Sequence, residues 1–206
     1  MLQTQTVSAK TLELISSLQQ QPELKSFVLV GGTALALQIG HRSSVDIDLF
    51  STEPFDVQTM TDLLVSEYGF KVLSQQKNTI RGIISDVMTD LITHPYPFLE
   101  IVEEDGIRMA SMKDIAAMKL NAIAISGERF KDFADIYFLL ESYRLSEMLD
   151  FYCTKYAQDR SLHILRSLLY FDDIVVADKP MFFLQKDLKL SAIKKRIRQA
   201  VKDVGI

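Results

Sequence analysis

Cysteine and tryptophan are the scarcest residues of this chain of 206 residues, which has one cysteine, Cys153, and no tryptophan. A single cysteine excludes an internal disulfide framework and is compatible with a reducing compartment. No run of about eighteen uncharged apolar residues is present, which argues against a transmembrane helix. The first residues, Met1 to Thr6, lack the basic and apolar segments of a secretory signal. These absences predict a cytoplasmic protein with no membrane partner.

The net charge of −4 argues against a protein that coats nucleic acid in general. The charge is uneven, however, because the segment 186–202 contains seven lysines and arginines and a single acid, Asp187. A basic helical end of this kind can contact a phosphate backbone. It is more often a solvated helix face, which is the reading that we favour.

The predicted elements alternate between helices and strands, which is typical of an α/β (α+β) protein. Expected helices cover residues 8–20, 33–39, 57–68, 111–125, 130–142, 146–157, 161–170 and 188–203; expected strands cover 27–30, the segment around 45–49, 70–75, 79–84, 87–93 and 107–109. The sequence therefore predicts a mixed β-sheet core flanked by helices in residues 1–110. A helical C-terminal half in residues 111–206 would follow this core and complete the functional site of the protein.

The acidic pair Asp46 and Asp48 is the most informative feature. It alternates with Val45, Ile47 and Leu49, the pattern of a half-buried strand on which both carboxylates project from one face. Like charges held so close repel, so a cation such as Mg²⁺ between them is favoured. The alternative is a solvated strand face, although Asp is disfavoured in strands.

A paired glycine precedes the acidic strand. Gly31 and Gly32 follow a short apolar strand, and Thr33 is expected to open a helix. Glycine lets the backbone approach a ligand, and a helix N-terminus offers free N–H groups to phosphate oxygens. A tight turn would need the same glycines, so the motif is specific only in combination with the acidic pair. Together they indicate an enzyme that moves a nucleoside phosphate.

The chain resembles the nucleotidyltransferase superfamily and, more narrowly, the AbiEii/AbiGii toxin family. The resembling segments are Val30-Gly-Gly-Thr-Ala-Leu-Ala-Leu37, Arg42-Ser-Ser-Val-Asp-Ile-Asp-Leu-Phe50, Asp90-Leu-Ile-Thr-His-Pro-Tyr-Pro-Phe98, 106–120, 131–140 and Tyr170-Phe-Asp-Asp173. The resemblance implies Mg²⁺- or Mn²⁺-dependent transfer from a nucleoside triphosphate. It also implies a toxin role beside a separately encoded antitoxin, with transfer RNA (tRNA) as the leading acceptor.

The resemblance implies a third carboxylate on a neighbouring strand, and Asp90 fits that position as a metal ligand and proton acceptor. Asp86 is the competitor, but it lies where a hairpin turn would need Asp. By the same resemblance, Lys119 would neutralise the β- and γ-phosphates, and Asp132 or Asp135 would orient Lys119, a base or a ribose. Asp132 is also explained as a first-turn acid that complements the helix dipole.

Other polar residues of the motifs have less specific readings. Ser44 shares the acidic face of the predicted strand and could hold a triphosphate oxygen. Arg42 could pair with phosphate, or bridge to Asp46 or Asp48. Lys131 is included in the nucleotide site by resemblance. His41 is expected to be a surface loop residue, since the other histidines form no ligand spacing with it.

Two alternatives to an enzyme that modifies a macromolecule stay open. One is a catalytically idle nucleotide- or antitoxin-binding module on the same fold. The other is a small-molecule modifier of the antibiotic nucleotidyltransferase type.

Overall fold

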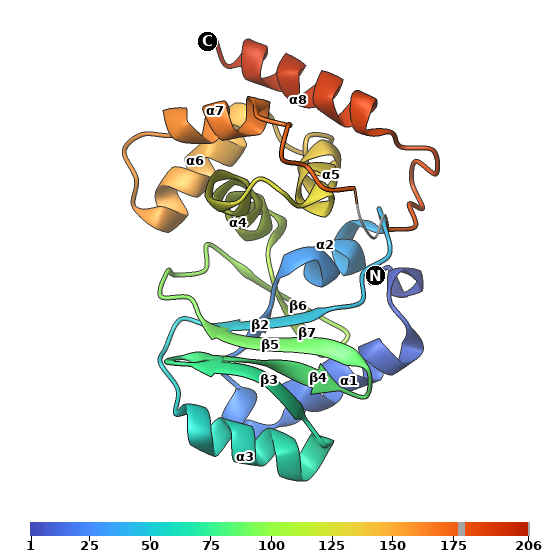
Figure 1. Cartoon of the computed structure of the whole chain (residues 1–206), viewed down its shortest axis with the longest axis vertical. Helices are drawn as coiled ribbons and strands as arrows, with labels where there is room; N and C mark the ends of the chain where they lie inside the picture. Colours follow the sequence, from blue (N-terminus) through green and yellow to red (C-terminus); the bar gives the residue numbers. More distant parts are fainter. Residues whose placement is uncertain (177–179, 206) are drawn as a thin grey trace.

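The computed structural model describes residues 1–176 and 180–205 (Figure 1). One mixed sheet contains all the strands of the described chain, in the order β3-β4-β5-β2-β1-β7-β6. Their bounds are β1 Val28–Leu29, β2 Ile47–Ser51, β3 Lys71–Gln76, β4 Thr79–Ile84, β5 Val87–Thr93, β6 Ile101–Glu104 and β7 Ile107–Ala110. β2 pairs in parallel with β5 and antiparallel with β1, so β2 lies at the middle of the sheet.

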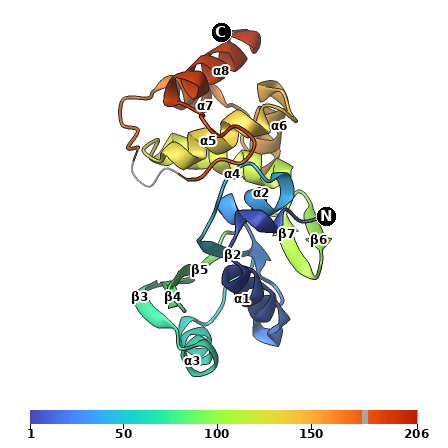
Figure 2. The ribbon, with the colours of Figure 1, turned by 90° about the vertical axis from the view of Figure 1, so that its right-hand side faces the viewer.

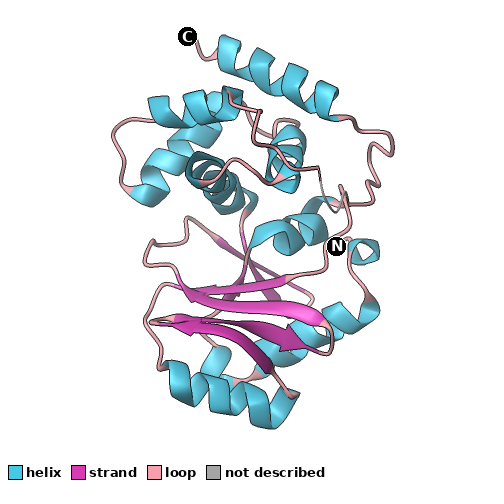
Figure 3. Cartoon of the chain, viewed as in Figure 1, coloured by secondary structure: helices cyan, strands magenta, loops and turns pink. Residues whose placement is uncertain are grey.

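Helices cover the sheet on both faces. Short 3-10 turns occupy Thr4–Thr6 and Pro22–Leu24, and the helices are α1 Ala9–Gln20, α2 Gly31–Ile39, α3 Val57–Tyr68, α4 Met112–Ile125, α5 Phe130–Leu139, α6 Leu145–Tyr156, α7 Leu162–Leu169 and α8 Leu190–Asp203. Figures 1 and 3 show α1 and α3 on one side of the sheet and α2 and α4 on the other. Figure 2 shows α4 to α8 gathered beyond α2, away from α3.

The helix boundaries follow from local capping. Ser8, Asp56 and Ser111 each accept a hydrogen bond from the backbone N–H three residues later, which satisfies a donor that the first turn would leave unpaired. Gly40 and Gly69 end α2 and α3 in the left-handed conformation. Such residues mark a helix end in the sequence before any packing is known.

The predicted α/β class and the mixed sheet flanked by helices are confirmed, and most elements lie within two or three residues of their expected bounds. Strands 79–84 and 87–93 match, and their connection at Ser85 and Asp86 has φ of 51° and 68°, so Asp86 is a turn residue as expected. β6 was not predicted. The division into domains 1–110 and 111–206 stays a prediction.

α4 joins the sheet to the helical half. It packs against α2, α5, α6, α7 and β7. Cys153 lies in α6, partly buried against the core, as expected for a structural thiol. Within the described ranges, every helix is too short or too polar to cross a membrane.

Candidate active site

Asp48 and Asp90 lie side by side in the sheet. Their Cα atoms are partners in the parallel pairing of β2 with β5, and paired residues of parallel strands project to the same face. β2 begins at Ile47, so Asp46 lies just before the strand and not on it, which corrects the expectation that the strand carries both acids. The structure therefore gives two carboxylates in strand register and a third at the entry of β2.

These carboxylates are poorly compensated. Burial raises the pKa of Asp48 to about 6. Lys119 opposes this rise, and the negative charges of Asp90 and Asp46 add to it. Burial also raises the pKa of Asp90, although Arg81 lowers it by an ion pair of 3.2 Å from Nε to Oδ2. The other oxygen, Asp90 Oδ1, is buried without a hydrogen-bond partner among the described residues. A bound cation would reduce the repulsion between the carboxylates and would give the unpaired oxygen of Asp90 a partner.

Arg81 was missed in the sequence, although a signal was present. The β4–β5 hairpin was predicted with its turn at residues 85 and 86. That turn fixes Arg81 opposite Asp90, as the antiparallel register shows. Cross-strand partners of opposite charge interact at this distance. Extending the predicted hairpin by its register would have identified the pair.

The paired glycines form the first turn of α2, which begins at Gly31 and not at Thr33 as predicted. Gly31 has φ of +69°, a conformation that favours glycine, and a Cβ there would collide with the Asp48 carboxylate. A Cβ on Gly32 would collide with the Arg42 guanidinium. The glycines therefore let the start of the helix lie directly against Asp48 and Arg42.

Thr33 and Ser44 connect α2 to the segment that leads into β2. The Thr33 hydroxyl donates a short hydrogen bond to the carbonyl of Asp46 and lies 2.9 Å from the Ser44 hydroxyl. Ser44 precedes β2 in a loop, so it does not share a strand face with Asp48 as predicted. These contacts position the main chain of Asp46 rather than leaving both hydroxyls free for a ligand.

Arg42 is bound to Asp135, not to Asp46 or Asp48. Its Nε donates to Asp135 Oδ1 at 2.6 Å and its Nη2 to Oδ2 at 2.9 Å, and both side chains are buried. Burial opposes the charge of Asp135, but Arg42 and Lys119 outweigh it and hold the pKa of Asp135 well below its ordinary value. Arg42 is therefore committed to a structural ion pair at the edge of the cleft.

His41 is buried, which contradicts its prediction as a surface loop residue. Its Nε2 lies 2.9 Å from Asp135 Oδ1, and it is 0% exposed. Burial lowers the pKa of His41, so the imidazole is neutral near pH 7 and donates its Nε2 proton to the carboxylate. The sequence around His41 does not indicate this partner, because Asp135 lies on α5, far along the chain.

Lys119 is held by both predicted acids of α5. Its Nζ lies 2.5 Å from Asp132 Oδ1 and 2.8 Å from Asp135 Oδ2. Burial opposes the charge on Lys119, but the two carboxylates outweigh it and raise its pKa. Asp132 also lies in the first turn of α5, where an acid complements the helix dipole. The network of Arg42, Lys119, Asp132 and Asp135 has two charges of each sign and is neutral overall.

A cleft of about 520 Å³ lies between the sheet and α4, at the glycines and carboxylates. Residues that bear on its chemistry are Gly31, Gly32, Arg42, Ser44, Asp46, Asp48, Arg81, Lys119, Arg129, Lys131 and Asp132. Asp90 does not line it directly, whereas its partner Arg81 does. Arg129 was not predicted as a site residue, and its side chain is 65% exposed. Its positive charge partly offsets the rise that burial causes in the pKa of Asp48 and Asp90.

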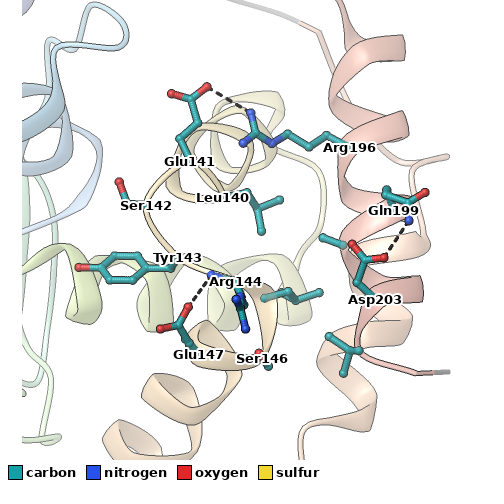
Figure 4. Close-up of a pocket in the computed structure, with 13 residues that line it drawn as sticks. Leu140, Glu141, Ser142, Tyr143, Arg144, Ser146, Glu147, Arg196, Gln199 and Asp203 are labelled. Atoms are coloured by element: carbon teal, nitrogen blue, oxygen red, sulfur yellow. Dashed lines mark hydrogen bonds and ion pairs between the residues drawn. The ribbon is translucent and has the colours of Figure 1, made fainter.

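A second hollow, of about 720 Å³, lies between the α5–α6 connection and α8 (Figure 4). Several of its charged groups already have partners: Arg196 pairs with Glu141 at 3.1 Å, Glu147 accepts from the backbone N–H of Arg144, and Asp203 accepts from the Gln199 side chain. None of the predicted site residues lines it. The smaller cleft is therefore the candidate active site.

The fit of a divalent metal is partial. In the part of the chain that the structure describes, no three His, Cys, Asp or Glu side chains are gathered closely enough to hold a metal ion. Asp48 and Asp90 nevertheless offer paired carboxylates, one with an unpartnered buried oxygen. Mg²⁺ is commonly held by one or two carboxylates together with substrate phosphates and water. The residues fit a metal that arrives with a triphosphate.

Solved structures of other proteins share the fold of this chain. The chain resembles the antibiotic-resistance factor ANT(2'')-Ia with a TM-score of 0.55 and 15% identity, over 76% of this chain and 94% of that one. It resembles JHP933 from Helicobacter pylori with a TM-score of 0.53 and 17% identity, over 96% and 93% of the two chains. The fold is thus that of the nucleotidyltransferases.

Sequence comparison narrows the class. Residues 13–96 and 83–204 match the family described as "Nucleotidyl transferase AbiEii toxin, Type IV TA system". An uncharacterized protein of Aquifex aeolicus (strain VF5) is 36% identical over 154 residues, which are 71% of this chain and 74% of that protein. The chain belongs to the AbiEii family of nucleotidyltransferases, as the resemblance predicted.

Proposed function

We propose that the protein transfers a nucleoside monophosphate from a nucleoside triphosphate to an acceptor hydroxyl. Mg²⁺ or Mn²⁺ would be held by Asp48 and Asp90 together with the substrate phosphates, with Asp46 as the predicted third ligand once the metal brings the acids together. The observation that carries the proposal is the register of Asp48 and Asp90 beside the start of α2. The α2 N-terminus offers N–H groups to phosphate oxygens, and Lys119 and Lys131 line the same cleft. The metal, when bound, supplies charge neutralisation at the reacting phosphate.

Asp90 is the proposed proton acceptor. Burial raises its pKa, and one of its oxygens has no partner in the described chain, so it can take a proton from the acceptor hydroxyl. The hydroxyl oxygen then forms a bond to the α-phosphorus, and the bond from that phosphorus to the bridging oxygen of the β-phosphate breaks. Pyrophosphate leaves with the electron pair of the broken bond. Asp132 and Asp135 position Lys119 for the β- and γ-phosphates.

We further propose that the acceptor is tRNA and that the protein is the toxin of a type IV toxin–antitoxin pair acting in the cytoplasm. Family membership supports this proposal, and the exposed Arg129 at the cleft suits a phosphate backbone. Incubation with each labelled triphosphate and total cell extract tests it. We expect labelled RNA with the wild type and none with Asp46→Ala. Binding of no triphosphate by the wild type with Mg²⁺ or Mn²⁺ would refute the enzyme.

Transfer to a small molecule is the second candidate. The cleft volume of about 520 Å³ lies within the range of small-molecule pockets. In that case the labelled product of the same extract would pass an ultrafiltration membrane, whereas labelled RNA would be retained. Equal growth inhibition by the wild type and Asp46→Ala would instead favour an idle binding module.

A further inference from the structure

The cleft continues beyond the carboxylates onto an aromatic wall. Burial alternates along β2, so Asp48 and Phe50 share the face that borders the cleft, with Ile47 and Leu49 buried on the other. Consecutive residues on one face of a strand are about 7 Å apart. Phe50 is therefore the first side chain that a ligand reaches after passing Asp48 along the strand.

Two further rings stand beside Phe50. His94, which directly follows β5, has its ring centroid 5.5 Å from that of Phe50, and Tyr156 at the end of α6 lies 5.6 Å from His94, nearly perpendicular to it. All three line the cleft. The apolar side chains of Ile115 and Met118, from α4, also line the cleft. The cleft thus has a charged end and an end with flat and apolar walls.

His94 carries a polar atom that the protein does not satisfy. Its Nε2 is buried and has no hydrogen-bond partner among the described residues. Burial, with Lys155 nearby, lowers the pKa of His94 to about 4, so the ring is neutral near pH 7. Leaving a buried polar atom unpaired is unfavourable, because the atom has lost its hydrogen bonds to water. A ligand that offers a hydrogen-bonding edge as well as a flat face would remove this cost.

The loop that begins with His94 is attached to α4 and α6. The buried Lys155 Nζ donates to Asp114 at 2.8 Å and to the carbonyl of Pro97 at 3.1 Å, and Asp114 accepts from the backbone N–H of Leu99 and Glu100. Three hydrogen bonds, at Pro97, Leu99 and Glu100, hold the segment after His94 in one arrangement, and the Lys155–Asp114 ion pair joins the two side chains that make them. A wall held in this way is preorganised, which lowers the entropy cost of binding.

We propose that Phe50, His94 and Tyr156 form a nucleobase-binding site at the aromatic end of the cleft. The inference rests on the proposed function. In that function the phosphates lie at the α2 N-terminus and beside Asp48, and the base lies beyond the phosphates. A base has the required flat face for Phe50 and an edge with hydrogen-bonding groups for His94, while the buried ring of Tyr156 packs against His94 and completes the wall. It belongs either to the incoming triphosphate or to the acceptor, and binding measurements separate these sources.

The test compares Phe50→Leu and His94→Leu with Tyr170→Leu, a matched control on an exposed ring outside the cleft. Each variant is checked by thermal melting, and two ring variants keep the test valid should one fail to fold. The probes, all with Mg²⁺, are the four nucleoside triphosphates, inorganic tripolyphosphate and a short single-stranded RNA. Tripolyphosphate reports the phosphate site alone, because it has no base.

Stacking on an aromatic ring changes affinity by about 5- to 150-fold per base. We expect such a loss in the ring variants for a triphosphate but not for tripolyphosphate, which assigns the base to the incoming nucleotide. A loss confined to the RNA assigns it to the acceptor. Unchanged binding of both, or equal losses with tripolyphosphate, overturns the nucleobase site while leaving the proposed function intact. A wild type that binds none of the probes overturns both.

Discussion

Asp135 binds Arg42 through both carboxylate oxygens, at 2.6 Å and 2.9 Å, although the two residues lie 93 positions apart in the chain. The same carboxylate reaches His41 and Lys119. It is therefore the point at which α5, the α2–β2 connection and α4 are joined. The candidate active site is built against the neutral buried network of Arg42, Lys119, Asp132 and Asp135 rather than on isolated charges.

Asp135→Asn is expected to destabilise the fold strongly. It removes one charge from a buried network and leaves Arg42 and Lys119 with a single carboxylate, Asp132. Breaking a buried ion pair in this way costs about 3–5 kcal/mol. Denaturant unfolding measures the loss. The control is Asp173→Asn on an exposed acid, expected to change stability by less than about 0.5 kcal/mol. Equal small losses in the two variants would show that the network does not hold the helices.

Gly31→Ala is expected to damage the site beyond its cost to the backbone. Alanine at φ of +69° is strained, and its Cβ would displace the Asp48 carboxylate. Gly69→Ala is the matched control, because Gly69 has φ of +63° but open space around a Cβ. Both variants should lose about 1–3 kcal/mol of unfolding free energy. Only Gly31→Ala should also lose metal-dependent transfer; full activity in that variant would separate Gly31 from the reaction.

The local features of the site were predictable, and its long-range partners were not. The strand pattern, the paired glycines and the turn at Asp86 are encoded within a few residues, whereas the placement of Asp90 on a strand that neighbours Asp48 came from the family resemblance. The burial of His41 and the commitment of Arg42 depend on a carboxylate from α5. No periodicity in the chain specifies how α5 packs against the α2–β2 connection.

Asp48→Asn is expected to separate stability from activity. The pKa of Asp48 is raised to about 6, so its charged form is disfavoured in the folded state near pH 7. Neutral asparagine of the same shape should therefore raise the free energy of unfolding, by about 1 kcal/mol after allowance for solvent screening. Loss of the metal carboxylate should lower transfer more than about a hundredfold.

The control for this exchange is Asp86→Asn, at a turn residue whose side chain is 96% exposed. It should leave transfer unchanged. Steady-state transfer assays and denaturant unfolding on the same preparations measure both quantities. A clear fall in the stability of Asp48→Asn would mean that Asp48 is a structural acid, already compensated by Lys119 without any metal.

His94 should make the fold sensitive to mild acid. Its pKa is about 4 in the folded protein, against about 6.5 for an exposed histidine. Between these values the unfolded chain binds more protons, so stability is fully present above pH 6.5 and declines as the pH falls toward 4. Asp48 acts in the opposite direction, because its raised pKa makes the folded state bind protons below pH 6.

The contribution of His94 is therefore read from a variant and not from the wild type alone. His94→Gln removes the titration and keeps a polar side chain. Between pH 7.5 and pH 5 the wild type should lose about 1 kcal/mol more unfolding free energy than the variant, a figure reduced for the partial exposure of the ring. Denaturant unfolding at the two pH values gives the difference directly. Equal losses of unfolding free energy in the two proteins would show that the protonation of His94 is not coupled to folding. The ring would then be accessible to water in the folded protein.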